Sequence, residues 1–443
     1  MKEDRFVKSD VLPGNYFEGK NGLSYRFTIL KDIAEAGQSP SLPYDDSQRE
    51  SIFGLYGKYK DFAIYVHFPW CVEHCSYCHY YRGPMLKREK LEAMLKAERK
   101  HAQVFDERID LPSRHIRSIY FGGGTPTVLP PDLLEEAVGY YVERYRRGEE
   151  CEVCLEASII TLKTMKKIEI LERYIDRLSV GVQSFDDNIL KLIERKHTGV
   201  HAKELLEELV PRFASVNVDL IYGLCDQDLS SWLATIETAI RLRIPSLTIY
   251  RLDIRDIPAI SQTFRQEPER FPDEYRCWRM YDEAEKLLVA AGYRENLVGW
   301  YLLPQVKDTT VYRERWEKQS PCISLGPRLH NYAADHFYET LEKHEDYIAA
   351  VEAGRLPIRS IYPLSPQKQL VWYVLAQWKS NSPVYQSVII QRFGENLLEW
   401  FMKLIQHYLT WGVLNQSGDK IQVNEEYHYI LEWILLELIE SLK

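Results

Sequence analysis

The 443-residue chain lacks three features that mark other classes of protein. It has no run of about 18 or more apolar residues, so we expect no segment that spans a bilayer as a helix. It has no excess of basic residues, since the formal net charge is -9, which disfavours a general affinity for nucleic acid. Its eight cysteines are too few at this length to read as a disulfide framework.

The composition that remains is typical of a large globular protein. Hydrophobic residues make up 45% of the chain and charged residues 27%. The length predicts a large core and two domains. The first residues are charged and lead into no apolar segment, so we expect no secretory signal and a cytoplasmic location. We also expect a monomer that acts on a small molecule and binds neither nucleic acid nor membrane.

The middle of the chain alternates short β-branched or aromatic runs with longer amphipathic segments. Residues 1 to about 60 show no clear period, and we interpret them as an N-terminal extension lying on the main domain. From Ala63 onward the period-2 and apolar runs predict six strands, at Ala63–Phe68, Ile116–Phe121, Glu152–Ala157, Arg177–Val182, Val216–Ile221 and Ser246–Arg251. Helix-like segments lie between them, at Lys87–Val104, Pro131–Arg146, Thr161–Leu171, Val200–Phe213 and Leu229–Leu242.

This alternation indicates right-handed βαβ units and a parallel sheet. Six units are too few for a closed eight-fold barrel, so we predict an α/β fold with a partial (β/α)6 barrel over residues 61–360. A further helix at Asp273–Ala291 leads into less regular sequence.

Residues 361–443 predict a smaller, mostly helical domain. Helices are expected at Gln367–Trp378, Ser387–Phe393, Glu395–Thr410 and Tyr427–Ser441, with a hairpin over residues 412–423. Helices with one hairpin indicate a winged-helix-like domain. Its third-helix region carries little positive charge, so a structural or substrate-lid role is favoured over DNA binding.

Three closely spaced cysteines are the most informative feature. Cys71, Cys75 and Cys78 form a Cys-x3-Cys-x2-Cys pattern directly after the first predicted strand. Four thiolates would satisfy every iron of a four-iron cluster, whereas three leave one iron open to a small molecule. An open position is what a metal needs for chemistry, so the spacing favours a reactive cluster over a structural one.

Other polar residues fall at the ends of the later strands. Gly122–Gly124 follow the second strand, Glu156 ends the third, Gln183 follows the fourth, Asp219 lies in the fifth and Tyr250 ends the sixth. In parallel α/β barrels, active sites form at the carboxyl ends of the strands. We therefore expect these residues, with Arg195, on one rim beside the cysteines.

Several of these residues also have a plainer interpretation. The glycines fit a tight turn, Glu156 an internal hydrogen bond, Arg195 a surface ion pair and Asp219 the fixing of a strand end. A second pair, Cys151-x2-Cys154, lies on a predicted strand where residues three apart face opposite sides, so we interpret it as structural.

Taken together, four motifs resemble the radical S-adenosylmethionine superfamily. They are the cysteine pattern, Gly-Gly-Gly-Thr-Pro at 122–126, Gly-Val-Gln-Ser-Phe-Asp at 181–186 and Asp-Leu-Ile-Tyr-Gly-Leu at 219–224. The order and spacing are similar to the branch typified by oxygen-independent coproporphyrinogen III oxidase. That branch also holds heme chaperones and class C radical methyltransferases.

The resemblance implies a set of cofactor contacts. Cys71, Cys75 and Cys78 would hold a [4Fe-4S] cluster, and S-adenosylmethionine would bind its open iron. The residues implied to bind the first or a second S-adenosylmethionine are Tyr65, Tyr77, Gly123, Gly124, Thr125, Glu156, Gln183, Arg195, Asp219 and Tyr250. Two S-adenosylmethionine molecules are typical of this branch. An electron donor such as flavodoxin or ferredoxin is implied as well.

Two departures point away from the heme-pathway roles. Where the decarboxylase has a further cysteine, two places after Cys78, this chain has Tyr80, and where heme chaperones carry His-Asn-x-x-Tyr it has residues 309–316. The candidate catalytic residues are Tyr80 and His79; His79 flanks the cysteines, where it could donate a proton to a substrate or hydrogen-bond a cluster sulfur. The resulting hypothesis is radical cleavage of S-adenosylmethionine followed by C-methylation or cyclopropanation of an unsaturated or aromatic substrate. The alternatives are oxidative decarboxylation of coproporphyrinogen III and heme-binding chaperone activity.

Overall fold

The computed structural model describes residues 33–36, 46–78, 83, 85–254, 258–306, 314, 317–333 and 335–442. Its centre is a twelve-stranded sheet in the order β12-β11-β10-β9-β1-β2-β3-β4-β5-β6-β8-β7. The six predicted strands are its middle, β1 (Asp61–Phe68), β2 (His115–Gly123), β3 (Glu152–Ser158), β4 (Arg177–Gln183), β5 (Ser215–Tyr222) and β6 (Ser246–Arg251). They run parallel and in chain order. The predicted partial (β/α)6 barrel is confirmed.

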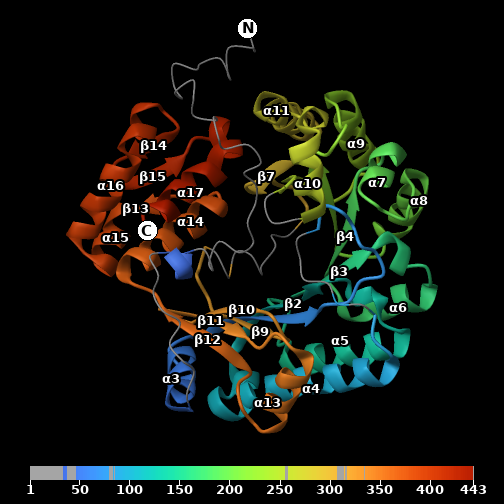
Figure 1. Cartoon of the computed structure of the whole chain (residues 1–443), viewed down its shortest axis with the longest axis vertical. Helices are drawn as coiled ribbons and strands as arrows, with labels where there is room; N and C mark the ends of the chain where they lie inside the picture. The colour runs from blue at the N-terminus through green and yellow to red at the C-terminus, as the bar shows by residue number, and fades with distance from the viewer. Residues whose placement is uncertain are drawn as a thin grey trace.

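Helices between these strands lie around the outside of the sheet (Figure 1). They are α4 (Arg88–Ile109), α5 (Pro131–Tyr145), α6 (Met165–Tyr174), α7 (Asp187–Leu192), α8 (Gly199–Leu209) and α9 (Leu229–Arg241). Several begin at a side-chain cap, as at Asp186, Thr198 and Asp228, whose oxygens accept hydrogen bonds from amides in the first turn. The central strands are buried on both faces, which is why they read as nearly continuous apolar runs.

The sheet continues beyond the six predicted strands on both sides. At the far side of β6 lie β8 (Trp300–Leu302), which is antiparallel to β6, and β7 (Arg294–Leu297), which is antiparallel to β8. Beside β1 lies β9 (Cys322–Leu325), which is parallel to it, followed by β10 (His330–Ala333), β11 (His336–Thr340) and β12 (Ile358–Pro363). These strands have three to six residues each, too short for a reliable period, and the sequence indicated only less regular structure here.

Further helices complete the barrel region. They are α10 (Pro258–Gln266), α11 (Glu274–Ala290) and α13 (His344–Glu352). Within residues 1–60, which we interpreted as an N-terminal extension, Asp46–Tyr56 form helix α3. Ile52, Phe53 and Tyr56 of that helix are buried in the main core. Its apolar positions occupy little more than one turn, which is too short a pattern to predict a helix.

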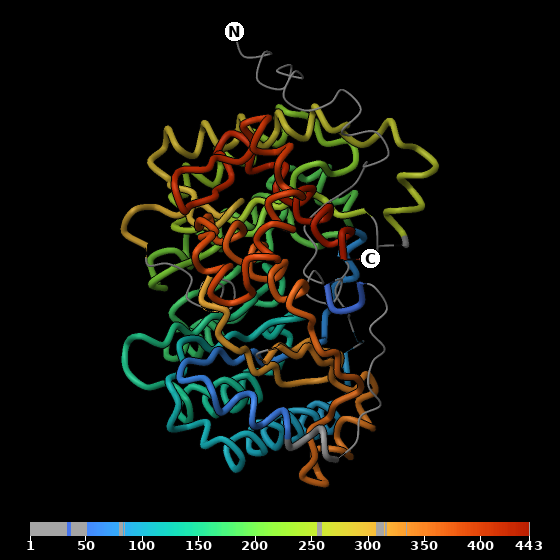
Figure 2. The backbone as a smooth tube through the Cα atoms, turned by 90° about the vertical axis from the view of Figure 1, so that its left-hand side faces the viewer, coloured from blue at the N-terminus to red at the C-terminus, as the bar shows by residue number. Residues whose placement is uncertain are grey.

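The C-terminal part has the predicted helices and hairpin. It contains α14 (Pro366–Lys379), α15 (Gln386–Phe393), α16 (Glu395–Thr410), α17 (Leu431–Glu440) and a three-stranded sheet of β13 (Val384–Tyr385), β15 (Lys420–Val423) and β14 (Leu414–Ser417). This arrangement agrees with a winged-helix-like domain, while the exact domain boundaries stay a prediction. In both views this part lies beside the segment around α11 (Figures 1 and 2). None of the helices in the described ranges is long and apolar enough to span a bilayer.

Candidate functional site

A cavity of about 210 Å³ lies at the carboxyl ends of the central strands. Twelve of the thirteen predicted cofactor and metal residues line it, namely Cys71, Cys75, Cys78, Tyr77, Gly123, Gly124, Thr125, Glu156, Gln183, Arg195, Asp219 and Tyr250. They come from six separate strand ends and their loops. Their convergence is the geometry expected of a ligand site in a parallel α/β sheet.

The three cysteines lie on the loop that follows β1. Cys75 is buried, Cys71 and Cys78 are half-buried, and all three are free thiols. The Sγ of Cys71 lies 3.5 Å from the Thr125 hydroxyl, and Nη1 of Arg195 lies 3.5 Å from the Sγ of Cys75. The guanidinium of Arg195 thus places a positive charge beside one of the three cysteines.

The donor set therefore fits an iron–sulfur cluster chemically. Within the described residues, however, no three side chains of His, Cys, Asp or Glu are grouped as a ready-made metal site. The assignment of Cys71, Cys75 and Cys78 as cluster ligands thus remains a prediction.

The glycine-rich loop after β2 is packed tightly against the loop after β1. The amide of Gly124 donates to the Phe68 carbonyl at 2.7 Å, and that of Thr125 to the Trp70 carbonyl at 2.9 Å. A Cβ on Gly124 would lie 2.6 Å from the Trp70 oxygen, so only glycine fits. These two amides are engaged within the chain, which leaves the Thr125 hydroxyl as the polar group of this loop that lies beside Cys71.

Glu156 is held by two hydrogen bonds across the rim. Its Oε1 accepts from the Tyr120 hydroxyl at 2.7 Å and its Oε2 from the Gly123 amide at 3.0 Å. The internal hydrogen bond considered from sequence is therefore present, and the side chain still lines the cavity. Burial raises the pKa of Glu156 to about 7, with the two hydrogen bonds opposing the rise.

Asp219 belongs to a polar network inside the barrel. Its carboxylate accepts from Asn217 Nδ2 at 2.9 Å and from the Ser179 hydroxyl at 3.3 Å. The amide oxygen of Asn217 accepts in turn from Ser246 at 2.7 Å and Thr248 at 3.0 Å. Burial raises the pKa of Asp219 to about 6, opposed first by the charge of Arg177.

Gln183 sits at a bulge between β4 and β5. Its backbone is left-handed, with φ of 74°, and the pairing register shifts between Gly181 and Gln183. A Cβ on Gly181 would lie 2.9 Å from Gln183 Nε2, so the side chain turns back over β4. The bulge aims this amide at the cavity instead of along the strand.

Arg195 is buried and is not part of a surface ion pair. Its Nη1 lies 3.1 Å from Oε2 of Glu73, and the two side chains are 6% and 4% exposed. Its Nη2 donates to the Gly181 carbonyl, while its Nε is buried with no hydrogen-bond partner among the described residues. Glu73 was missed from the sequence because it occupies a spacer position of the cysteine pattern.

The three tyrosines assigned to cofactor binding lie in different surroundings. Tyr77 lines the cavity, and burial holds its pKa well above the usual value, so its hydroxyl stays neutral. Tyr250 lines it from the end of β6. Tyr65 is not among the lining residues; it stacks on Tyr120 with ring centroids 5.9 Å apart. The candidate catalytic residues His79 and Tyr80 lie outside the described residues, as does most of the segment 309–316.

Arg177 is a second residue that the sequence did not single out. It is 2% exposed, donates to Cys154 Sγ at 3.3 Å and lies 5.4 Å from the centroid of the Trp300 ring. Trp300 lines the cavity, so the Arg177 guanidinium contacts a side chain of the cavity wall. Cys154 and Cys151 are both buried, in agreement with a structural role for that pair.

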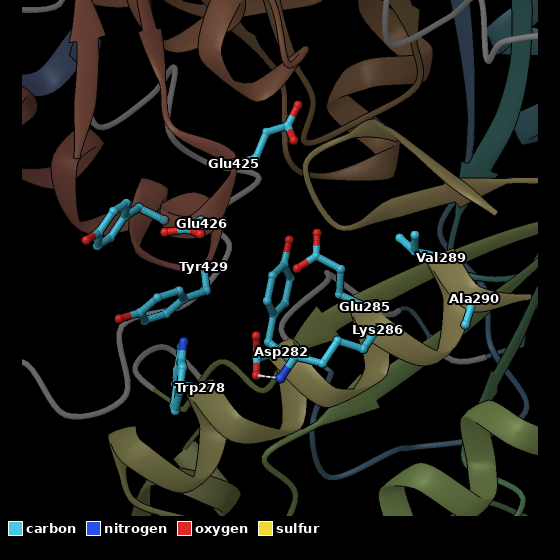
Figure 3. A pocket seen from close by; sticks show the side chains of 11 residues that line it. Trp278, Asp282, Glu285, Lys286, Val289, Ala290, Glu425, Glu426 and Tyr429 are labelled. Atoms are coloured by element: carbon cyan, nitrogen blue, oxygen red, sulfur yellow. Dashed lines mark hydrogen bonds and ion pairs between the residues drawn. The ribbon is translucent and has the colours of Figure 1, made fainter. Parts of the chain in front are cut away.

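A second cavity of about 430 Å³ lies between α11 and the segment before α17 (Figure 3). Its aromatic wall includes Trp278 and Tyr429, with centroids 6.2 Å apart. Glu285 lines it, and burial together with the negative charge of Glu295 raises its pKa to about 7. This cavity contains none of the residues predicted for cofactor binding.

Comparison with known proteins agrees with the resemblance seen in the motifs. The family model described as the radical SAM superfamily matches residues 65–239. The heme chaperone HemW of Escherichia coli K12 is 29% identical over 249 residues, which is 55% of this chain and 63% of that protein. The match thus spans about three fifths of that relative's length. A mitochondrial radical S-adenosyl methionine domain-containing protein 1 of Bos taurus is 29% identical over 400 residues, 86% of this chain and 88% of that protein.

A solved structure supports the same fold over nearly the whole chain. Coproporphyrinogen III oxidase from Escherichia coli, described as a radical SAM enzyme, superposes with a TM-score of 0.79. The match covers 95% of this chain and 100% of that one, at 18% sequence identity. At this identity the likeness establishes the fold and leaves the reaction open.

Proposed function

Because the chain belongs to the radical S-adenosylmethionine superfamily, in the branch that includes the coproporphyrinogen III oxidase fold, we propose that it binds a [4Fe-4S] cluster and cleaves S-adenosylmethionine reductively. The observation that carries the proposal is the convergence of three cysteines and nine further predicted residues on one cavity. A cluster held by Cys71, Cys75 and Cys78 would supply the electron that breaks the carbon–sulfur bond, giving methionine and a 5'-deoxyadenosyl radical.

The residues of the chain provide the binding contacts for such a ligand. Arg195 offers a cation for a carboxylate, and Glu156 and Asp219 offer acceptors for hydroxyl or ammonium groups. Gln183 can donate and accept at the same place. The aromatic side chains of Tyr77 and Tyr250 line the same cavity and pack against a hydrophobic cluster, which would limit the access of water to a reactive centre.

Our finer hypothesis concerns the use of the radical. A second S-adenosylmethionine would give up a hydrogen atom from its methyl group, and the resulting methylene radical would add to an unsaturated or aromatic carbon. One further electron from the electron donor and loss of S-adenosylhomocysteine from the adduct would leave the transferred carbon on the substrate. The basis is the replacement of the decarboxylase cysteine by Tyr80 and the absence of His-Asn-x-x-Tyr at 309–316. An electron donor such as flavodoxin or ferredoxin, and a reducing compartment such as the cytoplasm, suit this chemistry.

The named relatives favour a second candidate, heme binding. Two experiments separate the possibilities. Anaerobically reconstituted protein, given dithionite and S-adenosylmethionine, should form 5'-deoxyadenosine, whereas Cys71→Ala, Cys75→Ala or Cys78→Ala should lose both the iron–sulfur absorbance and that product. A Soret shift on heme titration without 5'-deoxyadenosine would instead support a chaperone.

Methyl-labelled S-adenosylmethionine tests the finer hypothesis. Label should appear in a substrate-derived product. Formation of 5'-deoxyadenosine with label only in methionine and in unreacted S-adenosylmethionine would rule out methyl transfer. Release of carbon dioxide from coproporphyrinogen III would support oxidative decarboxylation instead of methyl transfer.

A further inference from the structure

Glu73 joins three separate parts of the site. It lies between Cys71 and Cys75, and its Oε1 accepts from the amide of Lys196 at 2.8 Å. Its Oε2 accepts from the Ser158 hydroxyl at 2.9 Å and lies 3.1 Å from Arg195 Nη1. The cysteine loop is thereby connected to the end of β3 and to the loop after α7.

The plain interpretation of this contact is a structural cross-link. A buried carboxylate needs partners, and Glu73 has three. Two observations connect this contact with ligand binding. Both Glu73 and Arg195 line the cavity, and the Nε of Arg195 is buried without a hydrogen-bond partner among the described residues. Arg195 thus lies at the cavity wall with a guanidinium whose hydrogen-bonding capacity the described residues satisfy only in part.

We propose that Glu73 is a positioning residue that fixes the Arg195 guanidinium and, as a charge already beside it, limits its attraction for the carboxylate of S-adenosylmethionine. This inference rests on the proposed function, since it assumes that S-adenosylmethionine binds in this cavity. Two carboxylates sharing one buried guanidinium repel each other, and the repulsion is strong where water is excluded. Glu73 therefore sets how much of the ligand's affinity comes from its carboxylate.

The test compares two ligands that differ in that group. S-adenosylmethionine and its decarboxylated analogue share the sulfonium and the adenosine, and only the first carries a carboxylate. Affinities of both are measured by anaerobic calorimetry on reconstituted wild-type protein and on Glu73→Gln. The ratio of the two affinities measures what the ligand's carboxylate contributes to binding. Removing the carboxylate changes the ligand in the same way for both proteins, so a difference in the ratio reports on how each protein interacts with that group.

We expect Glu73→Gln to increase the preference for the carboxylate ligand about tenfold, with the analogue bound as in the wild type. Glu73→Asp, which keeps the charge but withdraws it from Arg195, should give a smaller increase. Glu172→Gln is the matched control: it removes an ion pair of the same 3.1 Å length, to Arg212, on the outside of the barrel, and should leave the ratio unchanged.

The outcomes are distinct. An unchanged or reduced ratio in both Glu73→Gln and Glu73→Asp overturns the inference and leaves Glu73 as a cross-link only. If Glu73→Gln does not fold, the Glu73→Asp ratio decides alone. Wild-type protein that carries a cluster and binds neither ligand refutes the proposed function itself, which is a different result.

Discussion

His428 and Glu295 form a buried ion pair between the C-terminal part and the barrel sheet, with Nδ1 and Oε2 2.6 Å apart. Glu295 lies in β7, and its other oxygen accepts from the Tyr281 hydroxyl at 2.8 Å and the Gly299 amide at 2.7 Å. One carboxylate therefore connects α11, the β7–β8 turn and the segment before α17. We expect the attachment of the C-terminal part to depend on pH through this pair.

The first prediction concerns that dependence. Burial opposes the charge of His428, but Glu295 outweighs it, so the pKa of His428 is raised above 6.5; the pKa of Glu295 is lowered below 4.5 by the histidine despite burial. The pair's full contribution to stability should be present between the ordinary values of 4.5 and 6.5. It should be lost as pH rises from 6.5 through the raised pKa of His428, and as pH falls from 4.5 through the lowered pKa of Glu295. In His428→Gln, the melting temperature measured from pH 5 to 9 should no longer show the change with pH that this ion pair causes. An unchanged slope would contradict the assignment.

A second prediction concerns Glu285, in the cavity between α11 and the segment before α17. Its pKa of about 7 in the folded protein lies above its ordinary value of 4.5, so the folded state binds this proton more tightly than the unfolded state. Stability should therefore be lost as pH rises from about 4.5 to 7. Glu285→Gln should be more stable than the wild type at pH 8 and equal to it near pH 4.5, measured by thermal unfolding. Exposed Glu237→Gln on α9 serves as the control and should show no such difference.

A third prediction concerns the glycine loop. Gly123 has φ of +112°, and a Cβ there would lie 2.3 Å from His67 Nδ1. Gly123→Ala combines backbone strain with overpacking and should destabilise the fold by about 3 kcal/mol. Gly148→Ala meets only the strain, because φ is +70° but nothing lies within 4 Å, and should cost about 1 kcal/mol. Urea denaturation of both variants measures the difference, and equal costs would show that His67 yields easily.

A fourth prediction concerns the polar interior of the barrel. Asn217 makes four buried hydrogen bonds, to Ser179, Asp219, Ser246 and Thr248. Asn217→Ala removes a buried amide and one hydrogen bond from each of those partners, and should cost about 3 kcal/mol in urea denaturation. Asn415→Ala, on the exposed β14–β15 hairpin, should cost less than about 0.5 kcal/mol. A small effect at Asn217 would mean that water replaces the amide.

The sequence predicted the central strands because they are buried on both faces. Strands such as Arg177–Gln183 and Ser246–Arg251 are long enough, and apolar enough, to stand out from the helices beside them. The strands β7 to β12 do not have that advantage. They have three to six residues each, most of their pairings are antiparallel, and their partners are set by the main sheet instead of by their own sequence.

The site residues found from the sequence are likewise those that stand beside a recognisable pattern. Cys71, Glu156 and Gln183 could be located because each follows a recognisable strand or motif. Glu73 and Arg177 carried no such mark: the first looked like a spacer, and the second like the opening residue of a strand. Their importance comes from partners that only the folded chain brings near, Arg195 for one and Trp300 for the other.

The pairing of β9 with β1 also has a consequence for how the chain is made. Strand β1 is parallel to β9 on one side and to β2 on the other, yet β9 comes from residues 322–325. During synthesis, one edge of β1 stays unpaired until β9 has been made, which takes roughly 10 to 50 seconds at ordinary elongation rates. The cysteine loop after β1 lacks its final surroundings over the same interval. An unpaired strand edge is prone to associate with other chains over such an interval. Slow synthesis of the segment between β2 and β9 should therefore lower the yield of folded protein more than slow synthesis of the C-terminal helices.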